Sequence, residues 1–330
     1  MAVICPAQPP GPRCRVAGAL AVTVGLLAAL LTTCGTTDPR DLLKDIEGGR
    51  VILGTKYDQP GLGMRNPDRS MSGFDVDVAT YVVDRIADEH GWRHPRITWR
   101  ETPSAQRETL IGNGEVDIIA ATYSIDAARA KRVAFAGPYL VLRQGLLVRA
   151  DDTTLRSLTD LGKGRTLCSV SGSTSAQNVK AQLPGVQLQE FDSYSACVTA
   201  LHQKEVDAVT TDETILAGFA QLYAGEFRTV DMSYPKDACV GGRLQKAGSP
   251  FATERYGIGL AKGDTAAKDA VDAALTDMIS SGAWQRALRA SLGDGEVDRL
   301  LTRAGGFDRF RPAIGDLSFL DSTPPACRGA

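Results

Sequence analysis

From Val51 onwards the apolar and polar positions follow two alternating patterns along the chain. Short apolar runs predict strands, and longer stretches with apolar residues three and four positions apart are typical of amphipathic helices. A first series contains strand 51–55, helix 74–89, strand 96–100, helix 104–113 and strand 116–122. We expect this series to form one α/β unit.

A second series of similar design follows an extended segment at 139–149. It contains strand 165–170, helix 173–183, strand 186–190, helix 194–204, strand 207–210 and helix 213–222. The chain then returns through strand 256–260 and ends in helices around 265–281 and 283–292. This order predicts an α/β fold with a discontinuous lobe 1 (51–143 plus 256–330) and a lobe 2 (144–255).

The two series share a short sequence. Asn113–Ile119 and Gln203–Val209 each place a polar helix end before Glu-Val-Asp and an apolar strand. We therefore expect two lobes of comparable topology that face each other across a cleft. Ligands of open α/β sheets bind beyond the carboxyl ends of the strands, so the cleft is the expected binding site.

The N-terminus has the pattern of a secretory signal. Two arginines precede the uncharged, mostly apolar run Val16–Leu31, and Thr32-Thr33-Cys34-Gly35 follow it. We interpret residues 1–33 as a lipoprotein signal peptide, Cys34 as the lipidated first residue and residues 34–50 as a tether. The alternative is an uncleaved signal anchor. Both place the rest of the chain on the extracytoplasmic face of the cell membrane.

Composition narrows the class of protein. The chain has 330 residues, of which 43% are apolar and 23% charged, as in a folded soluble protein. Its 37 basic and 39 acidic residues leave a formal charge of −2, too balanced for a nucleic-acid-binding protein. The three histidines are not in metal-ligand spacing with a cysteine pair, and we expect no metal and no cofactor.

Four cysteines remain in the mature part, an even number in an oxidising compartment. They are Cys168, Cys197, Cys239 and Cys327. Three pairings are open. We favour Cys168 with Cys197, a strand and a helix of one local stretch, which leaves Cys239 for Cys327. Buried free thiols are the alternative.

Five motifs occur in order along the chain. They are Gly73–Ala79, Gly114–Ile118, Arg129 followed by Phe135–Tyr139, Gly172–Thr174, and Val206–Asp212. Together they resemble the extracellular solute-binding proteins of family 3, the polar amino-acid receptors of ABC importers. The resemblance covers about residues 50–292 and implies a periplasmic-binding-protein-like fold, with two lobes, two chain crossovers and a central ligand cleft. The segment 293–330 extends beyond it.

The resemblance implies a site for a zwitterion. Arg129 would hold the α-carboxylate, since its guanidinium offers two parallel donors, and Asp126 would cap the segment that carries it. Thr174, at a helix N-terminus, would make a second carboxylate contact. Asp212 would bind the ammonium, with Thr122 and Ser124 as further ligand contacts. The alternatives are a solvated surface Arg129, N-capping by Ser173, and an Asp212 that only caps a helix.

Side-chain specificity depends on two further cations. Family members that bind glutamate or aspartate supply an extra cation at the places that Lys56 and Arg107 occupy here. Two cations favour a ligand with a second carboxylate, whereas Asp58 opposes it. The alternatives are a solvated loop lysine and an exposed helix arginine paired with a neighbouring glutamate.

Three functions remain open at this point. The first is a monomeric, lipid-anchored receptor that delivers a free amino acid (glutamate or aspartate, with asparagine or glutamine weaker) to an ABC importer permease. The second is a sensor that binds the same amino acids and signals to a membrane partner. The third is a small-acid dehydratase-like enzyme. The enzyme is disfavoured because the pocket loops contain no Gly-x-Ser-x-Gly and no histidine to activate a nucleophile.

Overall fold

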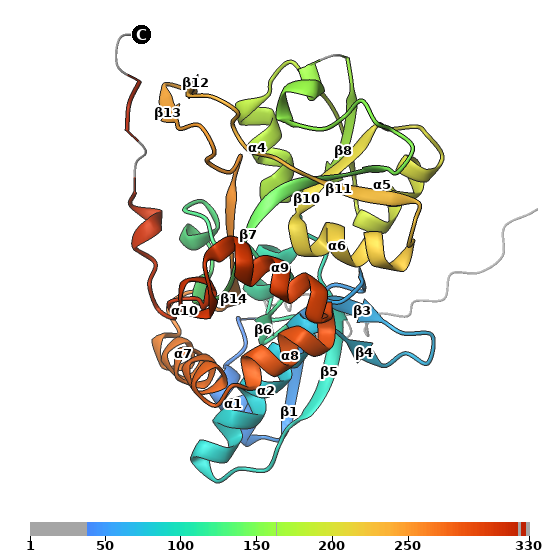
Figure 1. Cartoon of the computed structure of the whole chain (residues 1–330). Coiled ribbons are helices and arrows are strands. Elements are labelled where there is room, and N and C mark those ends of the chain that lie inside the picture. Colours follow the sequence, from blue (N-terminus) through green and yellow to red (C-terminus); the bar gives the residue numbers. More distant parts are fainter. Residues whose placement is uncertain (1–37, 163, 323–324, 328–330) are drawn as a thin grey trace, which may run out of the picture. The chain divides into compact units, whose positions relative to one another are not determined.

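The computed structural model describes residues 38–162, 164–322 and 325–327. Within these residues the chain forms an α/β fold. Its main sheet has the strand order β5-β1-β6-β14-β7-β10-β8-β9, and β11 also pairs with β7. We call the β5-β1-β6 side the first half and the β10-β8-β9 side, with β11, the second half (Figure 1).

The first half follows the predicted alternation of strands and helices. Its main elements are α1 (Leu42–Glu47), β1 (Arg50–Thr55), α2 (Phe74–His90), β5 (Arg96–Glu101), α3 (Arg107–Gly112) and β6 (Ile118–Ile119), and its small sheet consists of β2 (Asp58–Gln59), β3 (Gly63–Arg65) and β4 (Met71–Ser72). Helix α2 buries Phe74, Val78, Val82 and Ile86, which recur every fourth residue on one face. It ends at Gly91, whose φ of 68° satisfies the left-handed C-cap.

The second half repeats this order. Its elements are β8 (Thr166–Val170), α4 (Thr174–Gln182), β9 (Gln187–Phe191), α5 (Tyr194–His202), β10 (Ala208–Asp212), α6 (Glu213–Leu222), β11 (Phe227–Asp231) and the hairpin of β12 (Ala238–Val240) and β13 (Arg243–Gln245). Short 3-10 turns occur at η1 (Arg129–Lys131), η2 (Leu158–Gly162) and η3 (Ser318–Leu320). The carboxyl ends of β8 and β10 both lead directly into helices.

Two long strands carry the chain between the halves. Strand β7 (Ala134–Arg149) pairs with β14 (Thr253–Leu260) as far as Arg143, and with β10 from Gln144 onwards. The lobe boundaries that we predict from the sequence stay a prediction; one of them falls where β7 changes partner. Helices α7 (Thr265–Ser280) and α8 (Ala283–Leu292) then return to the first half, where both contact α2.

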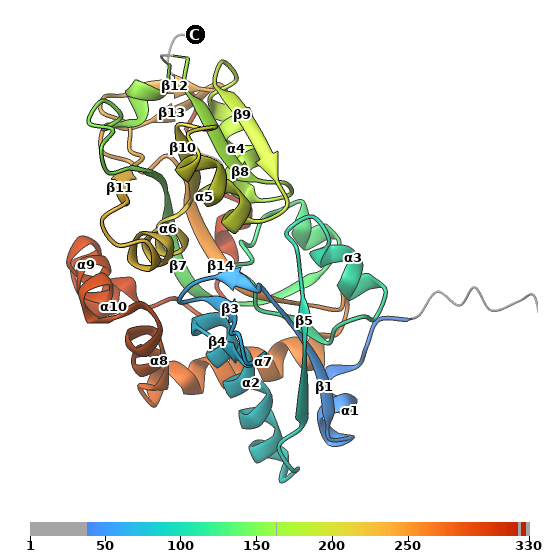
Figure 2. The same cartoon turned by 90° about the vertical axis from the view of Figure 1, so that its right-hand side faces the viewer.

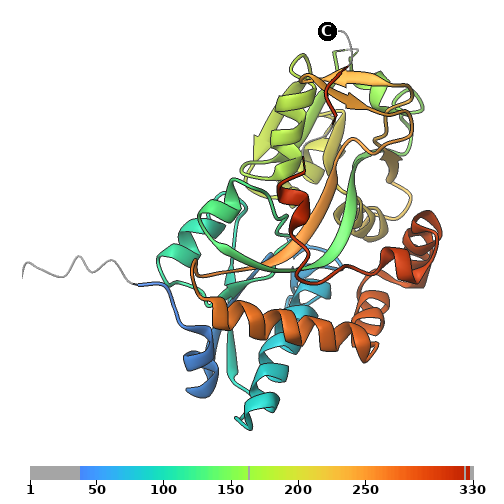
Figure 3. The same cartoon turned by 90° about the vertical axis from the view of Figure 1, so that its left-hand side faces the viewer.

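The residues after α8 form an extension that reaches both halves. It contains α9 (Asp294–Ala304) and α10 (Phe307–Phe310), and Gly315 then donates its N–H to the Gly137 carbonyl at 2.8 Å. Figure 3 shows the following segment, in red, passing the crossing strands toward the β12–β13 hairpin. There Cys327 forms a disulfide with Cys239. The tail that we assign to lobe 1 is thus covalently attached within the predicted lobe 2.

Both favoured cysteine pairings are confirmed. Cys168 of β8 is bonded to Cys197 of α5, and Cys239 of β12 is bonded to Cys327. The alternative of buried free thiols is therefore wrong. The first bond fastens a strand to the helix that covers it, and the second fastens the C-terminal extension to the hairpin.

The described part of the expected tether, residues 38–50, differs from the polar tether expected from the sequence. Leu42–Glu47 form helix α1, capped by the Asp41 side chain, and Leu42 and Ile46 are buried. Figure 2 shows α1 beside β1, against which it packs. The four-residue spacing of two apolar side chains is too short a pattern to separate a six-residue helix from a linker.

Two predicted elements of the first half are shorter than expected. The helix expected at 104–113 begins only at Arg107, and of the strand expected at 116–122 only Ile118 and Ile119 are paired. The strand ends early because the chain turns at Thr122, which has a φ of 47°. This turn directs the following residues toward the second half.

The shared Glu-Val-Asp sequences have equivalent structures. Asp117 donates its N–H to the Ile52 carbonyl (2.8 Å), and its Oδ2 accepts the Ile52 N–H (2.6 Å). Asp207 makes the same pair of bonds to Thr166, both at 2.8 Å. Each aspartate therefore fixes the start of the neighbouring parallel strand. The repeat in the sequence marks a real repeat of local structure.

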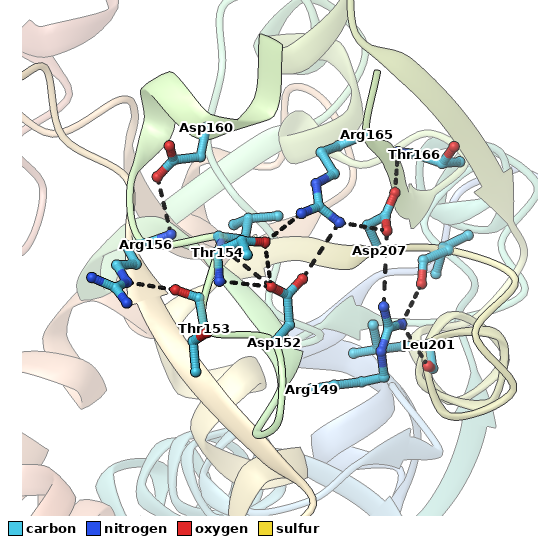
Figure 4. Close-up of polar contacts among 12 residues, drawn as sticks. Arg149, Asp152, Thr153, Thr154, Arg156, Asp160, Arg165, Thr166, Leu201 and Asp207 are labelled. Atoms are coloured by element: carbon cyan, nitrogen blue, oxygen red, sulfur yellow. Dashed lines mark hydrogen bonds and ion pairs between the residues drawn. The ribbon is translucent and has the colours of Figure 1, made fainter. Parts of the chain in front are cut away.

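In the second half, arginine side chains surround Asp207 (Figure 4). Arg165 contacts Asp207 at 3.0 Å and Asp152 at 3.5 Å. Arg149, the last residue of β7, donates to the carbonyls of Leu201 and Val206. These contacts join the ends of three strands at the edge of the sheet opposite the carboxyl ends of β8 and β10.

The repeat also predicts a stabilising substitution. Gly114 and Lys204 precede the two Glu-Val-Asp sequences and have φ of 65° and 62°. This left-handed conformation strains a residue with a Cβ, so Lys204→Gly is expected to raise the free energy of unfolding by about 0.5 to 1 kcal/mol. Gly114→Ala is expected to lower it, because its Cβ would lie 2.4 Å from the Asp38 carbonyl oxygen. Urea denaturation measures both; a destabilised Lys204→Gly variant contradicts the prediction.

Candidate ligand-binding site

The predicted ligand contacts meet where strands of both halves end. Lys56 follows β1, Thr122 and Ser124 follow β6, Thr174 begins α4 after β8, and Asp212 ends β10. Apart from Thr174, these side chains belong to buried residues. The topology therefore collects them at the carboxyl edge of the sheet, as expected for an open α/β fold.

Arg129 lies between the two halves. Its residue is 5% exposed, so the alternative of a solvated surface arginine is wrong. Asp126 Oδ1 accepts the N–H groups of Ala128 and Arg129 and so caps the short helix η1, as predicted. Arg129 Nη1 donates to the Ser124 carbonyl (2.6 Å) and Nη2 to the Gly172 carbonyl of the second half (2.8 Å).

Two carboxylates orient this guanidinium from one side. Arg129 Nε lies 3.4 Å from Glu108 Oε1 and 3.2 Å from Asp126 Oδ2. The two terminal nitrogens are thereby left for the carbonyls at the cleft. A bound carboxylate could replace these carbonyls as a two-oxygen acceptor, which is the geometry that arginine favours.

Lys56 and Arg107 form a buried cationic group beside Arg129. Lys56 Nζ donates to Ser104 Oγ (2.9 Å), and Arg107 donates to the carbonyls of Ser104 (3.3 Å) and Ala121 (3.0 Å). The two residues are 4% and 2% exposed, so the solvated and exposed alternatives are wrong. The Tyr123 ring lies 4.2 Å from the Arg107 guanidinium and 5.2 Å from that of Arg129.

The pKa values reflect this crowding of positive charge. Burial, followed by the charge of Arg107, lowers the pKa of Lys56 to about 7. Burial, followed by the charge of Arg129, lowers the pKa of Arg107 to about 10. Among the described residues neither side chain has a carboxylate within 4 Å. The cluster is therefore suited to an anionic group.

Asp58 offsets the crowding at Lys56 only in part, because its charge raises the pKa of Lys56 less than burial and Arg107 lower it. Asp58 Oδ2 accepts the backbone N–H (3.0 Å) and the hydroxyl (3.1 Å) of Ser195 in the first turn of α5. The contact joins β2 of the first half to a helix of the second half. The opposing charge considered from the sequence is thus used in a contact between the halves.

Asp75 positions Thr122. Its buried carboxylate accepts the Thr122 N–H and the Tyr139 hydroxyl, both at 2.7 Å. These bonds hold the left-handed turn at Thr122, the residue predicted to contact the ligand through its carbonyl and hydroxyl groups. Burial raises the pKa of Asp75 to about 6 against the effect of the two bonds.

The raised pKa of Asp75 predicts a pH dependence of stability. The native state keeps a proton on Asp75 up to about pH 6, whereas the unfolded chain loses it near 4. The stability that this group contributes is therefore full below the unfolded pKa and is lost as the pH rises through the folded one. Between pH 4 and 7, the free energy of unfolding of the wild type should fall by about 2 to 3 kcal/mol more than that of Asp75→Asn.

Urea denaturation at four pH values from 4 to 7 measures this difference. Glu89→Gln, an exposed change on the same helix, serves as the control and should leave the wild-type pH profile in place. Parallel pH profiles for wild type and Asp75→Asn would contradict the prediction.

In the second half, Ser173 and Thr174 have separate roles. Ser173 Oγ caps α4 by accepting the Ala176 N–H at 3.0 Å. Thr174 Oγ1 reaches the first half and contacts Ser124 Oγ at 3.3 Å. The N-capping alternative is therefore correct for Ser173, and it leaves Thr174 available to the cleft.

Asp212 presents a buried carboxylate to the cleft. Its Oδ2 accepts the Tyr256 hydroxyl (2.6 Å), and Ser175 Oγ lies 3.4 Å from Oδ1. It makes no side-chain cap to α6, so the helix-cap alternative is wrong. Burial and the nearby Glu254 raise its pKa well above the usual range. In the described part of the chain no cation pairs with it, so a ligand ammonium would supply the missing charge.

Four buried or partly buried residues escaped the sequence reasoning. They are the carboxylates Asp75 and Glu108 and the aromatic residues Tyr123 and Tyr256. Asp75 lies within the Gly73–Ala79 motif, which offered a signal. Tyr123 lies between Thr122 and Ser124, and Glu108 follows Arg107, so their positions in the sequence offered a signal as well. Only Tyr256 reaches the site through tertiary structure alone.

Two close backbone approaches show how tightly the halves meet. A Cβ on Gly172 would lie 2.7 Å from Ala105 Cα, and a Cβ on Gly218 would lie 2.2 Å from the Pro60 carbonyl oxygen. Each pair joins one residue of the first half to one of the second. Only glycine permits this degree of closure at either position.

A family model of bacterial extracellular solute-binding proteins, family 3, matches residues 51–294. The glutamate-binding protein GluB of Corynebacterium efficiens is 55% identical over 92% of this chain and 96% of its own length. The ABC transporter glutamine-binding protein GlnH of Bacillus subtilis is 32% identical over 77% of this chain and 89% of its own length.

Solved structures match the same fold. An ancestral arginine-binding protein bound to glutamine has a TM-score of 0.62 and 26% identity, and covers 74% of this chain and 99% of its own length. These findings confirm the resemblance inferred from the five motifs and the two-lobed α/β fold. They also agree with a binding protein and not with an enzyme.

Proposed function

Because the chain belongs to family 3 of the bacterial extracellular solute-binding proteins, we propose that it binds glutamate, and aspartate as a close analogue, for delivery to an ABC importer. Asparagine and glutamine are expected to bind more weakly. Arg129 and Thr174 hold the α-carboxylate, and Asp212, Ser124 and Thr122 hold the ammonium. Lys56 and Arg107 then hold the side-chain carboxylate.

The surplus of buried positive charge carries this proposal. Glutamate has a net charge of −1, so a cleft that encloses it needs one cation more than the zwitterion requires. Arg129 and Asp212 balance the zwitterion. Lys56 and Arg107 are both buried, and burial and the neighbouring guanidinium charges lower their pKa values more than the nearby carboxylates Asp58 and Glu108 raise them. A neutral glutamine side chain would leave that charge unbalanced.

The relatives support the same choice of ligand. The Corynebacterium proteins named for glutamate are 55% identical to this chain, whereas the Bacillus subtilis protein named for glutamine is 32% identical. Delivery to an importer rests on the family and on the name of the Bacillus subtilis relative, an ABC transporter component. Closure would follow binding to one half, with the strands near Arg143 and Thr253 bending.

Calorimetric titration with all twenty amino acids tests the ligand. Glutamate and aspartate should bind most tightly. Lys56→Met or Arg107→Met should weaken glutamate more than glutamine, by about 1 to 3 kcal/mol, the range of one charge-assisted hydrogen bond. Arg132→Met, an exposed cation near the site, is the matched control and should change neither affinity.

The pH dependence adds a second measurement. Lys56 loses its proton above about pH 7 in the free protein, whereas a bound carboxylate favours the charged form. Glutamate affinity should therefore fall from pH 7 to 9 in the wild type, and fall less in Lys56→Met. Equal losses of glutamate and glutamine in both variants, or arginine as the tightest ligand, would refute the acidic specificity.

The membrane attachment is part of the proposal. Residues 1–33 and Cys34 lie outside the described residues, so it rests on the apolar run and the Thr-Cys-Gly sequence. Within the described residues, no helix is long and apolar enough to cross a membrane. Mass spectrometry of the mature N-terminal peptide should find a diacylglycerol thioether on Cys34, and Cys34→Ala should abolish it. An unmodified Cys34 would favour the signal anchor.

A further inference from the structure

A cavity of about 350 Å³ lies between the crossing strands and the C-terminal extension. We call it the crossover cavity. It is lined by Val141, Leu142 and Arg143 of β7, by Pro250 and Thr253 before and at the start of β14, by Leu300, Arg303 and Ala304 of α9, and by Arg309 and Phe310 of α10. None of these residues belongs to the amino-acid site described above.

Three guanidinium groups give the crossover cavity its charge. Arg303 is paired with Glu213, the first residue of α6, which also accepts the backbone N–H of Arg143 at 2.9 Å. Arg143 and Arg309 have no carboxylate within 4 Å of their side chains among the described residues. Two of the three positive charges are thus not neutralised by the protein.

The rest of the lining is mostly apolar. Val141, Leu142, Pro250, Leu300 and Phe310 supply hydrocarbon surface, and Phe310 is 5% exposed. Apolar walls with a few converging polar groups are typical of small-molecule sites, and the volume is at the lower end of their range. An inorganic ion would leave these walls without contacts.

We propose that the crossover cavity binds a small organic dianion, such as a phosphate monoester or a dicarboxylate on a short apolar body, at a site separate from the amino-acid cleft. Two oxyanion charges match the two unpaired guanidinium groups, and arginine binds such groups through paired donors. The apolar body fills the space between β7 and α10.

The site depends on a part of this chain that the family model does not include. The match ends at residue 294, and five of the lining residues come from α9 and α10 beyond it. The extension therefore contributes half of the cavity. A shared property of the family does not account for it.

Calorimetric titration of the full chain with phenyl phosphate tests the proposal. Inorganic phosphate supplies the charge without the apolar body, and benzyl alcohol supplies the body without the charge. We expect phenyl phosphate to bind with 1:1 stoichiometry, both alone and with saturating glutamate, and the other two probes to bind at least tenfold more weakly. Arg309→Gln and Arg143→Gln should each weaken phenyl phosphate at least tenfold.

Arg311→Gln is the matched control, since Arg311 is exposed, lies two residues from Arg309 and does not line the crossover cavity. It should bind phenyl phosphate as the wild type does. The proposal is overturned if the wild type does not bind phenyl phosphate, if Arg309→Gln and Arg311→Gln bind it equally well, or if inorganic phosphate binds as tightly. Because the probes lack an ammonium group, failure here leaves the glutamate proposal untouched.

Discussion

Arg129→Ala is expected to weaken glutamate binding by about 2 to 5 kcal/mol, because the ligand α-carboxylate would be enclosed without its partner. Glu108 and Asp126 would also lose the cation that they flank, so the cleft would become more negative. Arg129 Nη2 contacts the Gly172 carbonyl of the second half, so a carboxylate bound in place of that carbonyl would lie between the two halves. Calorimetry with glutamate measures the change in affinity.

Lys131→Ala is the control, because it removes a positive charge from the same segment without removing the proposed carboxylate anchor. Lys131 lies in the same short helix η1 but is exposed, so its removal should leave the affinity unchanged. Arg129→Lys should rescue little, since an ammonium cannot offer two parallel donors. A folded Arg129→Ala variant that binds glutamate within threefold of the wild type would rule out Arg129 as the carboxylate anchor.

Gly218→Val is expected to weaken glutamate binding by about 2 to 4 kcal/mol, or roughly 30-fold to 1000-fold, without touching the ligand. Its Cβ would lie 2.2 Å from the Pro60 carbonyl oxygen across the cleft. The backbone of α6 fixes the position of the Cβ, and its neighbour is a backbone oxygen, so neither atom can rotate away and the halves must move apart to relieve the overlap. Thr174 and Asp212 would then no longer reach a ligand held by the first half.

Ala217→Val on the same helix provides the matched control. It adds a similar volume one residue away, where the side chain is only half-buried. It should bind glutamate nearly as the wild type does, and small-angle scattering should report the same closed form with ligand. If Gly218→Val closes and binds glutamate as the wild type does, the overlap with Pro60 does not hold the halves apart and the prediction is wrong.

The order of strands and helices could be predicted because most elements are long enough to show a clear period. Helix α2 and helix α6 begin within one residue of their expected positions, since their buried faces repeat every three or four residues. The small sheet of β2, β3 and β4 escaped prediction because strands of two or three residues have no measurable period. Helices α9 and α10 lay in the extension, where no motif applied.

The charged members of the site could be predicted because motifs place them at strand ends. Their partners could not. The pairing of Arg129 with Glu108, and the contact of Asp212 with Tyr256, join residues 21 and 44 positions apart, through the fold alone. The same is true of the bond between Asp58 and Ser195 of α5, which are 137 positions apart.

The attachment of the extension to the hairpin has a practical consequence. The chain enters the fold at Asp38 beside the first half, and the Cys239–Cys327 bond ties its other end to the second half. If the two halves move as we propose, the two ends of the folded region move with different halves. A donor and an acceptor fluorophore fused before Asp38 and after Ala330 should report cleft closure as a change in energy transfer. Replacing both Cys239 and Cys327 by serine should abolish the signal while leaving the Cys168–Cys197 bond and the amino-acid site in place.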